Sequence, residues 1–156
     1  MVWLGLRGRA KRAGISMSAK LIVLDANILV RAVLGSRVRK LLFENAASVA
    51  FFAPDAAYAE ARKYLPALLE KRGADPEQAM KLLERLEVLV RPVEVDLYQA
   101  LRAKALRRID ARDADDWPVL ACAMAMDCPV WTEDKDFFGA GVATWTTDRV
   151  EIYFES

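Results

Sequence analysis

The stretch from residue 21 to residue 29, LIVLDANIL, restricts the fold more than any other part of this sequence. Four consecutive apolar residues lead directly into Asp25, and Asn27 follows before a second apolar run. A continuous apolar run of this length is typical of a central parallel strand that is covered on both faces. Open α/β sheets bind their ligands beyond the carboxyl ends of such strands. Asp25 is therefore either a site residue or the N-cap of the next helix, and this stretch alone leaves both interpretations open.

Strand-like and helix-like segments alternate along the rest of the chain. We expect strands over residues 20–25, 49–53, 88–93, 129–134 and 142–147. We expect helices over residues 28–35, 36–46, 55–73, 75–86, 95–109 and 113–127, with a kink near Pro66 in the third of them. This alternation predicts an α/β fold, a three-layer α/β/α sandwich around a mostly parallel central sheet.

The composition excludes several classes of protein and of catalytic site. The 156 residues include no histidine, which excludes Ser-His-Asp and Cys-His chemistry and any metal site built on histidine. Cys122 and Cys128 are too few for a disulfide framework and match no zinc spacing, as is typical of core residues in a reducing compartment. No apolar run approaches the roughly 20 residues that a membrane span needs. We therefore expect a cytoplasmic protein without a membrane partner.

Positive charge is concentrated at the start of the chain. The segment MVWLGLRGRAKRAGIS holds four basic residues and no acidic one, although the net charge of the whole chain is only +1. Met17 resembles a natural start, so we interpret residues 1–19 as a basic N-terminal extension in front of one domain over residues 20–156. The alternative is a basic arm that contacts nucleic acid.

Four acidic residues occupy similar places in the predicted topology: Asp25, Glu60, Asp116 and Asp134. The carboxyl ends of parallel strands and the amino ends of the helices that follow them share one edge of a sheet. We therefore expect Asp25, Glu60 and Asp134 to converge there. Asp116 precedes its strand and joins them only if its helix runs back across the sheet, which the pattern does not decide. Each acid also has an ordinary interpretation as a helix cap or as a solvated helix carboxylate.

Carboxylates that gather without basic partners repel one another, and such clusters persist when a divalent cation neutralises them. Oxygen ligands without cysteine or histidine favour Mg²⁺ or Mn²⁺ over softer metals. The acidic residues therefore predict a site for one of these two ions.

The order of these segments resembles the PIN domain, a small metal-dependent ribonuclease fold that occurs in VapC-type toxins. The resemblance rests on Asp25 with Asn27, on Glu60, on DADDWPVLACAMAMD and on WTEDKDF, and it covers about residues 20–146. It implies an Mg²⁺- or Mn²⁺-dependent ribonuclease whose products carry a 5′-phosphate and a 3′-hydroxyl. Position by position, the catalytic and metal-binding acids of the family fall on Asp25, Glu60, Asp116 and Asp134.

The resemblance also assigns supporting residues. Asn27 and Thr132 match the polar positions that hold the carboxylates, and Asp136 is a metal-binding acid that some members add. Asp113, Asp115 and Asp116 all remain candidates for the third acid. Asp116 fits best because an apolar and alanine-rich run follows it.

An acidic pocket needs basic residues around it to attract RNA. We expect phosphate contacts from two groups, one early in the second helix and one before the acidic segment: Arg37, Arg39, Lys40, Arg107, Arg108 and Arg112. For any single residue among them, a solvated helix face is the ordinary interpretation. The resemblance further implies an antitoxin partner. Apolar helix surface at residues 33–34 and 41–43 could support a homodimer, with burial in the core as the alternative.

Other classes of function also start from an aspartate at the end of a strand. A haloacid-dehalogenase-type phosphatase needs D-x-D there, where this chain has Asn27 in the second acidic place. A receiver domain needs an acidic pair after its first strand and a lysine after its last, and neither is evident. The stronger alternative is a catalytically silent PIN-like module that binds nucleic acid or protein.

Overall fold

The structure is a computed structural model, and it describes residues 19–109 and 113–156. Nearly all of the predicted basic extension, and Arg112 among the predicted RNA contacts, lie outside the described residues. The expectations about them are therefore not tested by the structure.

The described strands form one five-stranded parallel sheet. They are β1 (Lys20–Leu24), β2 (Val49–Pro54), β3 (Val90–Val93), β4 (Val130–Trp131) and β5 (Thr144–Trp145), in the order β3-β2-β1-β4-β5. In the central strand, Val23 is paired with Phe52 of β2 on one side and with Val130 of β4 on the other. Every described strand pair is parallel, which confirms the expected sheet and places the carboxyl end of β1 at its centre.

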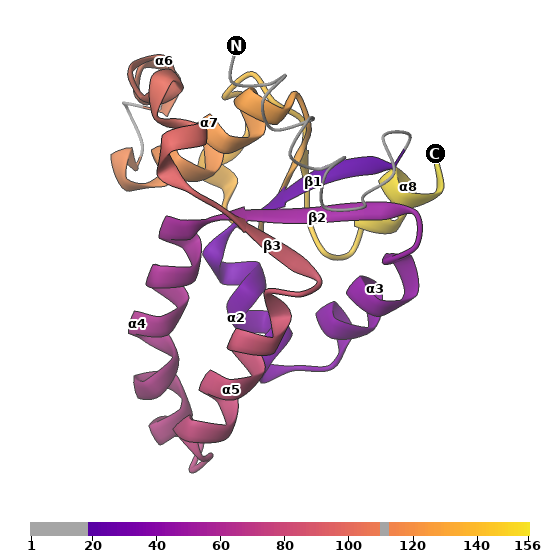
Figure 1. Cartoon of the computed structure of the whole chain (residues 1–156), viewed down its shortest axis with the longest axis vertical. Helices are drawn as coiled ribbons and strands as arrows, with labels where there is room; N and C mark the ends of the chain where they lie inside the picture. Colours follow the sequence, from indigo (N-terminus) through magenta and orange to yellow (C-terminus); the bar gives the residue numbers. More distant parts are fainter. Residues whose placement is uncertain (1–18, 110–112) are drawn as a thin grey trace.

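Helices cover both faces of this sheet (Figure 1). The helices α2 (Ala26–Leu34), α3 (Arg37–Asn45), α4 (Asp55–Lys71) and α5 (Pro76–Leu86) lie below the strands in this view. The helices α6 (Arg102–Ile109) and α7 (Trp117–Met126) lie above them, and α8 (Val150–Glu155) ends the chain. The predicted three-layer α/β/α sandwich is confirmed. Within the described ranges, none of the helices combines the length and the apolar character that spanning a membrane requires.

The core lies on both sides of β1 and β2, because β2 is apolar along its whole length and β1 is apolar after Lys20. All six residues of β2 are buried, as are the last four of β1. The helix α7 is almost completely buried, and its alanines and Cys122 leave room for the helix to approach the sheet closely. Trp131 is fully buried and packs against Phe51 and Phe154, with ring centroids 6.3 and 5.8 Å away. This part of the chain forms the rigid base of the sheet edge where Asp25 lies.

Several ordered segments differ in length or kind from the predicted ones. The last two strands contain two residues each, where six were expected. The helix expected over 95–109 begins as two 3-10 turns, because the Val95 amide and the Tyr98 hydroxyl both donate hydrogen bonds to Asp55 at the start of α4. The helix α4 includes Pro66, as expected.

The C-terminal helix α8 was not predicted. Lys20 donates from Nζ to the carbonyl oxygens of Tyr153 and Phe154, at 2.9 and 3.2 Å, and so caps the end of this helix. The Tyr153 hydroxyl donates to the Leu21 carbonyl at 2.7 Å. The end of the chain is thereby attached to its central strand.

Candidate metal centre

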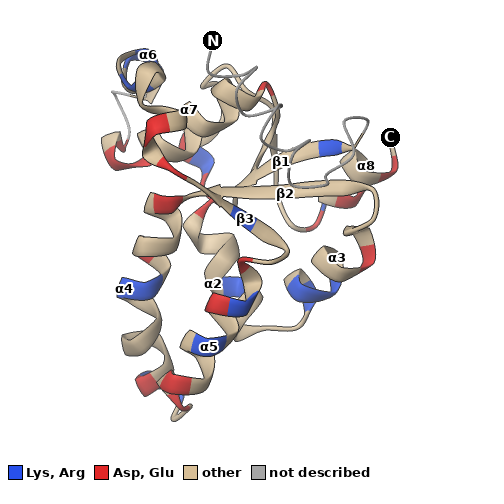
Figure 2. Ribbon diagram, viewed as in Figure 1, with Lys and Arg blue, Asp and Glu red and all other residues tan. Residues whose placement is uncertain are grey.

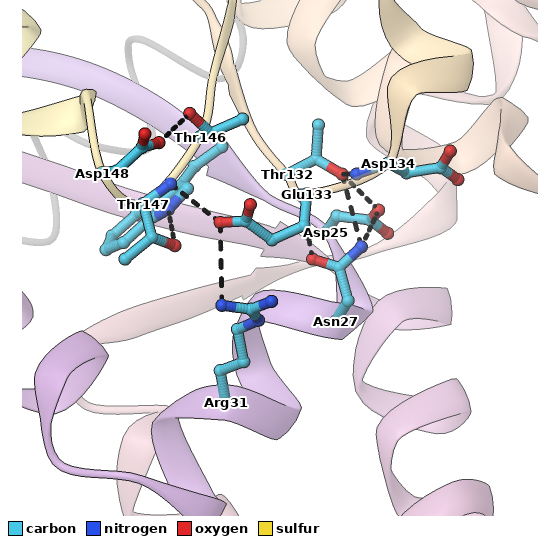
Figure 3. A network of polar contacts seen from close by, with 10 residues as sticks. Asp25, Asn27, Arg31, Thr132, Glu133, Asp134, Thr146, Thr147 and Asp148 are labelled. Carbon is cyan, nitrogen blue, oxygen red and sulfur yellow. Dashed lines mark hydrogen bonds and ion pairs between the residues drawn. The ribbon is translucent and has the colours of Figure 1, made fainter.

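Asp25 is both a helix cap and a member of the acidic cluster. It directly follows β1, and its Oδ1 accepts a hydrogen bond from the Ala26 amide at 2.7 Å, as an N-cap of α2 does. Its Oδ2 accepts hydrogen bonds from the Thr132 hydroxyl at 2.8 Å and from the Asn27 amide at 2.9 Å (Figure 3). The side chain is buried, with 4% of its surface exposed. Asp25 therefore acts as an N-cap through one oxygen, while its other oxygen is held by Thr132 and Asn27.

Thr132 and Asn27 join the end of β1 to the turn after β4. The buried Thr132 hydroxyl donates to Asp25 and accepts from the Asp134 amide at 2.9 Å. The Asn27 Nδ2 lies 3.3 Å from the same hydroxyl, and its Oδ1 accepts from the Glu133 amide at 3.3 Å. A hydroxyl offers one donor and two acceptor sites, and all of them are used here. This network fixes the position of Asp25 relative to Asp134.

Three further carboxylates meet beside this network. Asp116 directly precedes α7, and Asp134 caps a 3-10 turn whose second residue, Asp136, donates its amide to Asp134 at 2.9 Å. One carboxylate oxygen from each of Asp116, Asp134 and Asp136 lies within 4.8 Å of the other two. The helix α7 therefore begins at the same sheet edge, which is the step that the sequence pattern did not decide.

Asp25 and Glu60 are not part of that group of three, but they share a cleft with Asp116. The cleft has a volume of about 310 Å³, and its polar lining consists of Asp25, Glu60, Lys63, Tyr64, Asp115 and Asp116. Glu60 projects into it from the first half of α4. The structure thus brings the five predicted acids to one edge of the sheet. Lys63 and Tyr64 were not assigned to the site, although they follow Glu60 by one helical turn.

The pKa values reflect the crowding of negative charge. Burial raises the pKa of Asp116 to about 8, and the charges of Asp25, Asp113 and Asp134 act in the same direction. The pKa of Asp25 is raised by burial, lowered by the hydrogen bonds from Thr132 and Ala26, and raised again by the charge of Asp134. The pKa of Glu60 is raised by partial burial and then by Asp25, Asp113 and Asp115. In the protein alone, these carboxylates therefore destabilise one another.

The donor set fits a hard divalent cation. The Oδ2 of Asp116 is buried without a hydrogen-bond partner among the described residues. Within the same residues, no lysine or arginine forms an ion pair with Asp25, Asp116 or Asp134. A buried carboxylate without a partner is costly unless a proton or a cation compensates it. The three clustered oxygens of Asp116, Asp134 and Asp136 come from carboxylates, which suits Mg²⁺ or Mn²⁺.

None of the described residues that were predicted to contact RNA lines the acidic cleft. Lys40 forms an ion pair with Glu44 at 3.9 Å, and Arg108 donates to the Ala140 carbonyl at 3.5 Å. Arg37 and Arg107 are exposed, and Arg39 is half-buried. Figure 2 shows acidic residues where α4 and α7 begin and basic residues on α2 and α3.

The apolar helix surface considered for a homodimer lies largely in the core. Val33, Leu41 and Leu42 are buried, whereas 66% of the Phe43 surface is exposed.

Both the sequence and the fold are similar to those of known proteins. A family model described as the PIN domain matches residues 23–155. The fold is similar to that of VapBC2 from Rickettsia felis bound to a DNA fragment from its promoter, with a TM-score of 0.61, 14% identity, and 81% of this chain and 98% of that chain covered. It is also similar to FitAcB from Neisseria gonorrhoeae, with a TM-score of 0.59, 24% identity, and 81% and 97% covered.

A third similar structure is PAE2754 from Pyrobaculum aerophilum, with a TM-score of 0.62, 14% identity, and 90% of this chain and 92% of that chain covered. No functionally curated protein matches the sequence. At these identities, the three structures support the fold.

Proposed function

The chain belongs to the PIN domain family, and from that premise we propose that it is a ribonuclease that hydrolyses RNA phosphodiester bonds with Mg²⁺ or Mn²⁺. The observation that carries the proposal is the group of Asp116, Asp134 and Asp136, in which the Oδ2 of Asp116 is buried without a partner. Structural carboxylates at helix ends are normally paired or solvated. A group that raises the pKa of its own members is typical of a functional site.

Asp25, Asp116, Asp134 and Asp136 would hold the metal, directly or through water. The bound ion supplies an activated water and neutralises charge on the phosphoryl oxygens. Glu60 lines the acidic cleft together with Asp116, and in this proposal it completes the set of ligands or orients the attacking water.

The polar network around Thr132 has a positioning role in this proposal. It holds Asp25 and Asp134 at fixed places although their charges repel each other. Ligands held by such hydrogen bonds bind metals more tightly than free ones. The predicted phosphate contacts, from Arg37 to Arg112, would lead the RNA toward this edge.

We further propose that the protein is the toxin of a toxin–antitoxin pair in the cytoplasm and that it forms a homodimer. The similar structures VapBC2 and FitAcB support an antitoxin protein as a partner. Such a partner would cover the basic surface or insert a residue into the acidic cleft.

The test is cleavage of structured RNA in Mg²⁺, Mn²⁺ or EDTA by the wild type and by Asp25→Asn and Asp116→Asn. Asp127→Asn is the matched control, because Asp127 is exposed and has a φ of 52°, which asparagine also adopts. We expect metal-dependent cleavage by the wild type and the control, and at least a hundredfold loss (about 2.7 kcal/mol of barrier) in the other two.

Metal binding measured by calorimetry separates the alternatives. Absence of both binding and cleavage would contradict the proposal. Metal binding without cleavage of any RNA would favour the catalytically silent binding module.

A further inference from the structure

A second and larger cavity lies on the other side of the turn that carries Asp134. It has a volume of about 800 Å³, and the residues that matter here are Arg31, Ser36, Arg37, Arg72, Glu133 and Thr147. We call it the arginine cleft. It shares no lining residue with the acidic cleft. Its basic residues come from α2, from the start of α3 and from the end of α4.

The arginine cleft is connected through Asn27 and Glu133 to the acidic centre, by which we mean Asp25 and the group of Asp116, Asp134 and Asp136. Asn27 and Arg31 are four residues apart in α2 and so lie on the same face of the helix. Glu133 lies between them: its amide donates to Asn27 at 3.3 Å, and its Oε1 is 4.0 Å from the Arg31 guanidinium (Figure 3). From Asp25 to Arg31, the rise along the helix is about 9 Å, which equals two to three nucleotides of a stacked strand.

Two of the three guanidinium groups form no ion pair within the described part of the chain. Arg31 is balanced by Glu133, which also accepts the Thr147 amide at 2.8 Å. Arg37 and Arg72 form no ion pair with any described residue. Asp148 also lines the cleft, where it accepts a hydrogen bond from the Thr146 hydroxyl and is attracted to Arg37 across solvent. The cleft therefore offers unpaired planar donors at its wall, with hydroxyl groups beside them.

We propose that the arginine cleft binds the sugar–phosphate backbone of the RNA strand two to three nucleotides from the bond that is cut. Guanidinium groups donate in a fork that matches phosphate oxygens, and hydroxyls such as that of Ser36 make similar contacts. The connection to Asp25 favours RNA over an acidic protein segment, because a substrate strand must continue past the acidic centre. The inference rests on the proposed ribonuclease function.

The test measures RNA binding apart from cleavage. A labelled single-stranded RNA of about 12 nucleotides is titrated with the full chain in EDTA, and anisotropy gives Kd at several salt concentrations. The variants are Arg37→Gln, Arg72→Gln and the double variant. Arg85→Gln is the control for each single variant, because Arg85 is exposed on α5 and outside both clefts.

Each phosphate contact on a single strand contributes about 0.7 to the slope of log K against log salt. We expect each single variant to lower the slope by about 0.7 and the double variant by about 1.4, with Kd raised about tenfold in the latter. The control should bind as the wild type does. Thermal unfolding of each variant verifies that these exposed substitutions leave the fold intact.

Cleavage measured in parallel separates this inference from the proposed function. If wild type does not cleave RNA but the double variant loses RNA binding, the cleft is supported and the ribonuclease is contradicted. If wild type cleaves and the double variant binds RNA with unchanged affinity and slope, the ribonuclease stands and the cleft inference is wrong. A protein partner whose binding the double variant then loses would be the occupant instead.

Discussion

The crowded carboxylates predict an unusual dependence of stability on pH in the metal-free protein. Asp116 has a pKa of about 8 in the folded chain, against 3.8 for an ordinary aspartate. Between these two pH values the folded chain holds a proton that the unfolded chain has lost. The free energy of unfolding therefore falls as pH rises through this window. Below the window Asp116 is protonated in both states and destabilises nothing, and above it the full penalty applies. Asp25 and Glu60, whose pKa values are also raised, act in the same direction.

Replacing Asp116 by asparagine removes this penalty. One pKa unit corresponds to about 1.4 kcal/mol, so the difference sets an upper limit of roughly 6 kcal/mol. Asp116 keeps part of its surface in water, where screening weakens charge interactions, so we expect a gain of about 1–3 kcal/mol for Asp116→Asn at pH 8. Near pH 4, where Asp116 is protonated in the folded chain, variant and wild type should differ little. Asp127→Asn again serves as the control.

Urea unfolding in EDTA at pH values from about 4 to about 8 measures this effect. Addition of Mg²⁺ or Mn²⁺ should then stabilise the wild type by about 2.7 kcal/mol at a metal concentration of 100 times Kd, and should not stabilise Asp116→Asn. The reasoning fails if metal-free wild type is equally stable or more stable at pH 8 than at pH 5. It also fails if Asp116→Asn gains nothing at pH 8.

Three further predictions concern stability alone. Thr132→Val leaves the buried Asp25 with one hydrogen bond fewer, and urea unfolding should show a loss of about 1–3 kcal/mol; a neutral result would contradict the network. Gly141→Ala places a Cβ 2.7 Å from the Arg108 guanidinium at a φ of +90°, so urea unfolding should show a free energy of unfolding lower by about 1 kcal/mol or more. An unchanged value would show that the strain and the contact both relax. Lys20→Met removes the cap of α8, and hydrogen exchange should accelerate in the last six residues; unchanged protection there would show that the cap is dispensable.

Much of the fold could be predicted because the central strands are apolar on both faces. The short apolar runs that end at Asp25 and at Pro54 are typical of buried strands. The boundary between α4 and α5 is marked by Gly73, which follows the end of α4, and by Asp75, which is the N-cap of α5. The strand β4 was predicted but too long, because the chain turns where the Asp134 amide donates to the Thr132 hydroxyl. The helix α8 depends on distant contacts that no local pattern contains.

The site was predictable in part for a similar reason. Asp25 and Asp134 follow strands of one parallel sheet, so their meeting follows from topology. Asp116 came from the family resemblance, because the direction of α7 is a tertiary property. The arginine cleft was missed except for Arg37: its residues come from distant parts of the chain, and only the four-residue spacing of Asn27 and Arg31 signals it.

The strand order β3-β2-β1-β4-β5 has a consequence for the time at which the protein acquires its site during synthesis. The central strand is made first, but its neighbour on the acidic side is β4, more than one hundred residues later. A nascent chain that ends between residues 117 and 131 contains Asp25 and Asp116 but has neither the Thr132 hydroxyl that holds Asp25 nor the carboxylates of Asp134 and Asp136. The acidic group can therefore assemble only after residues 132–136 have been synthesised, and products that terminate before them lack it.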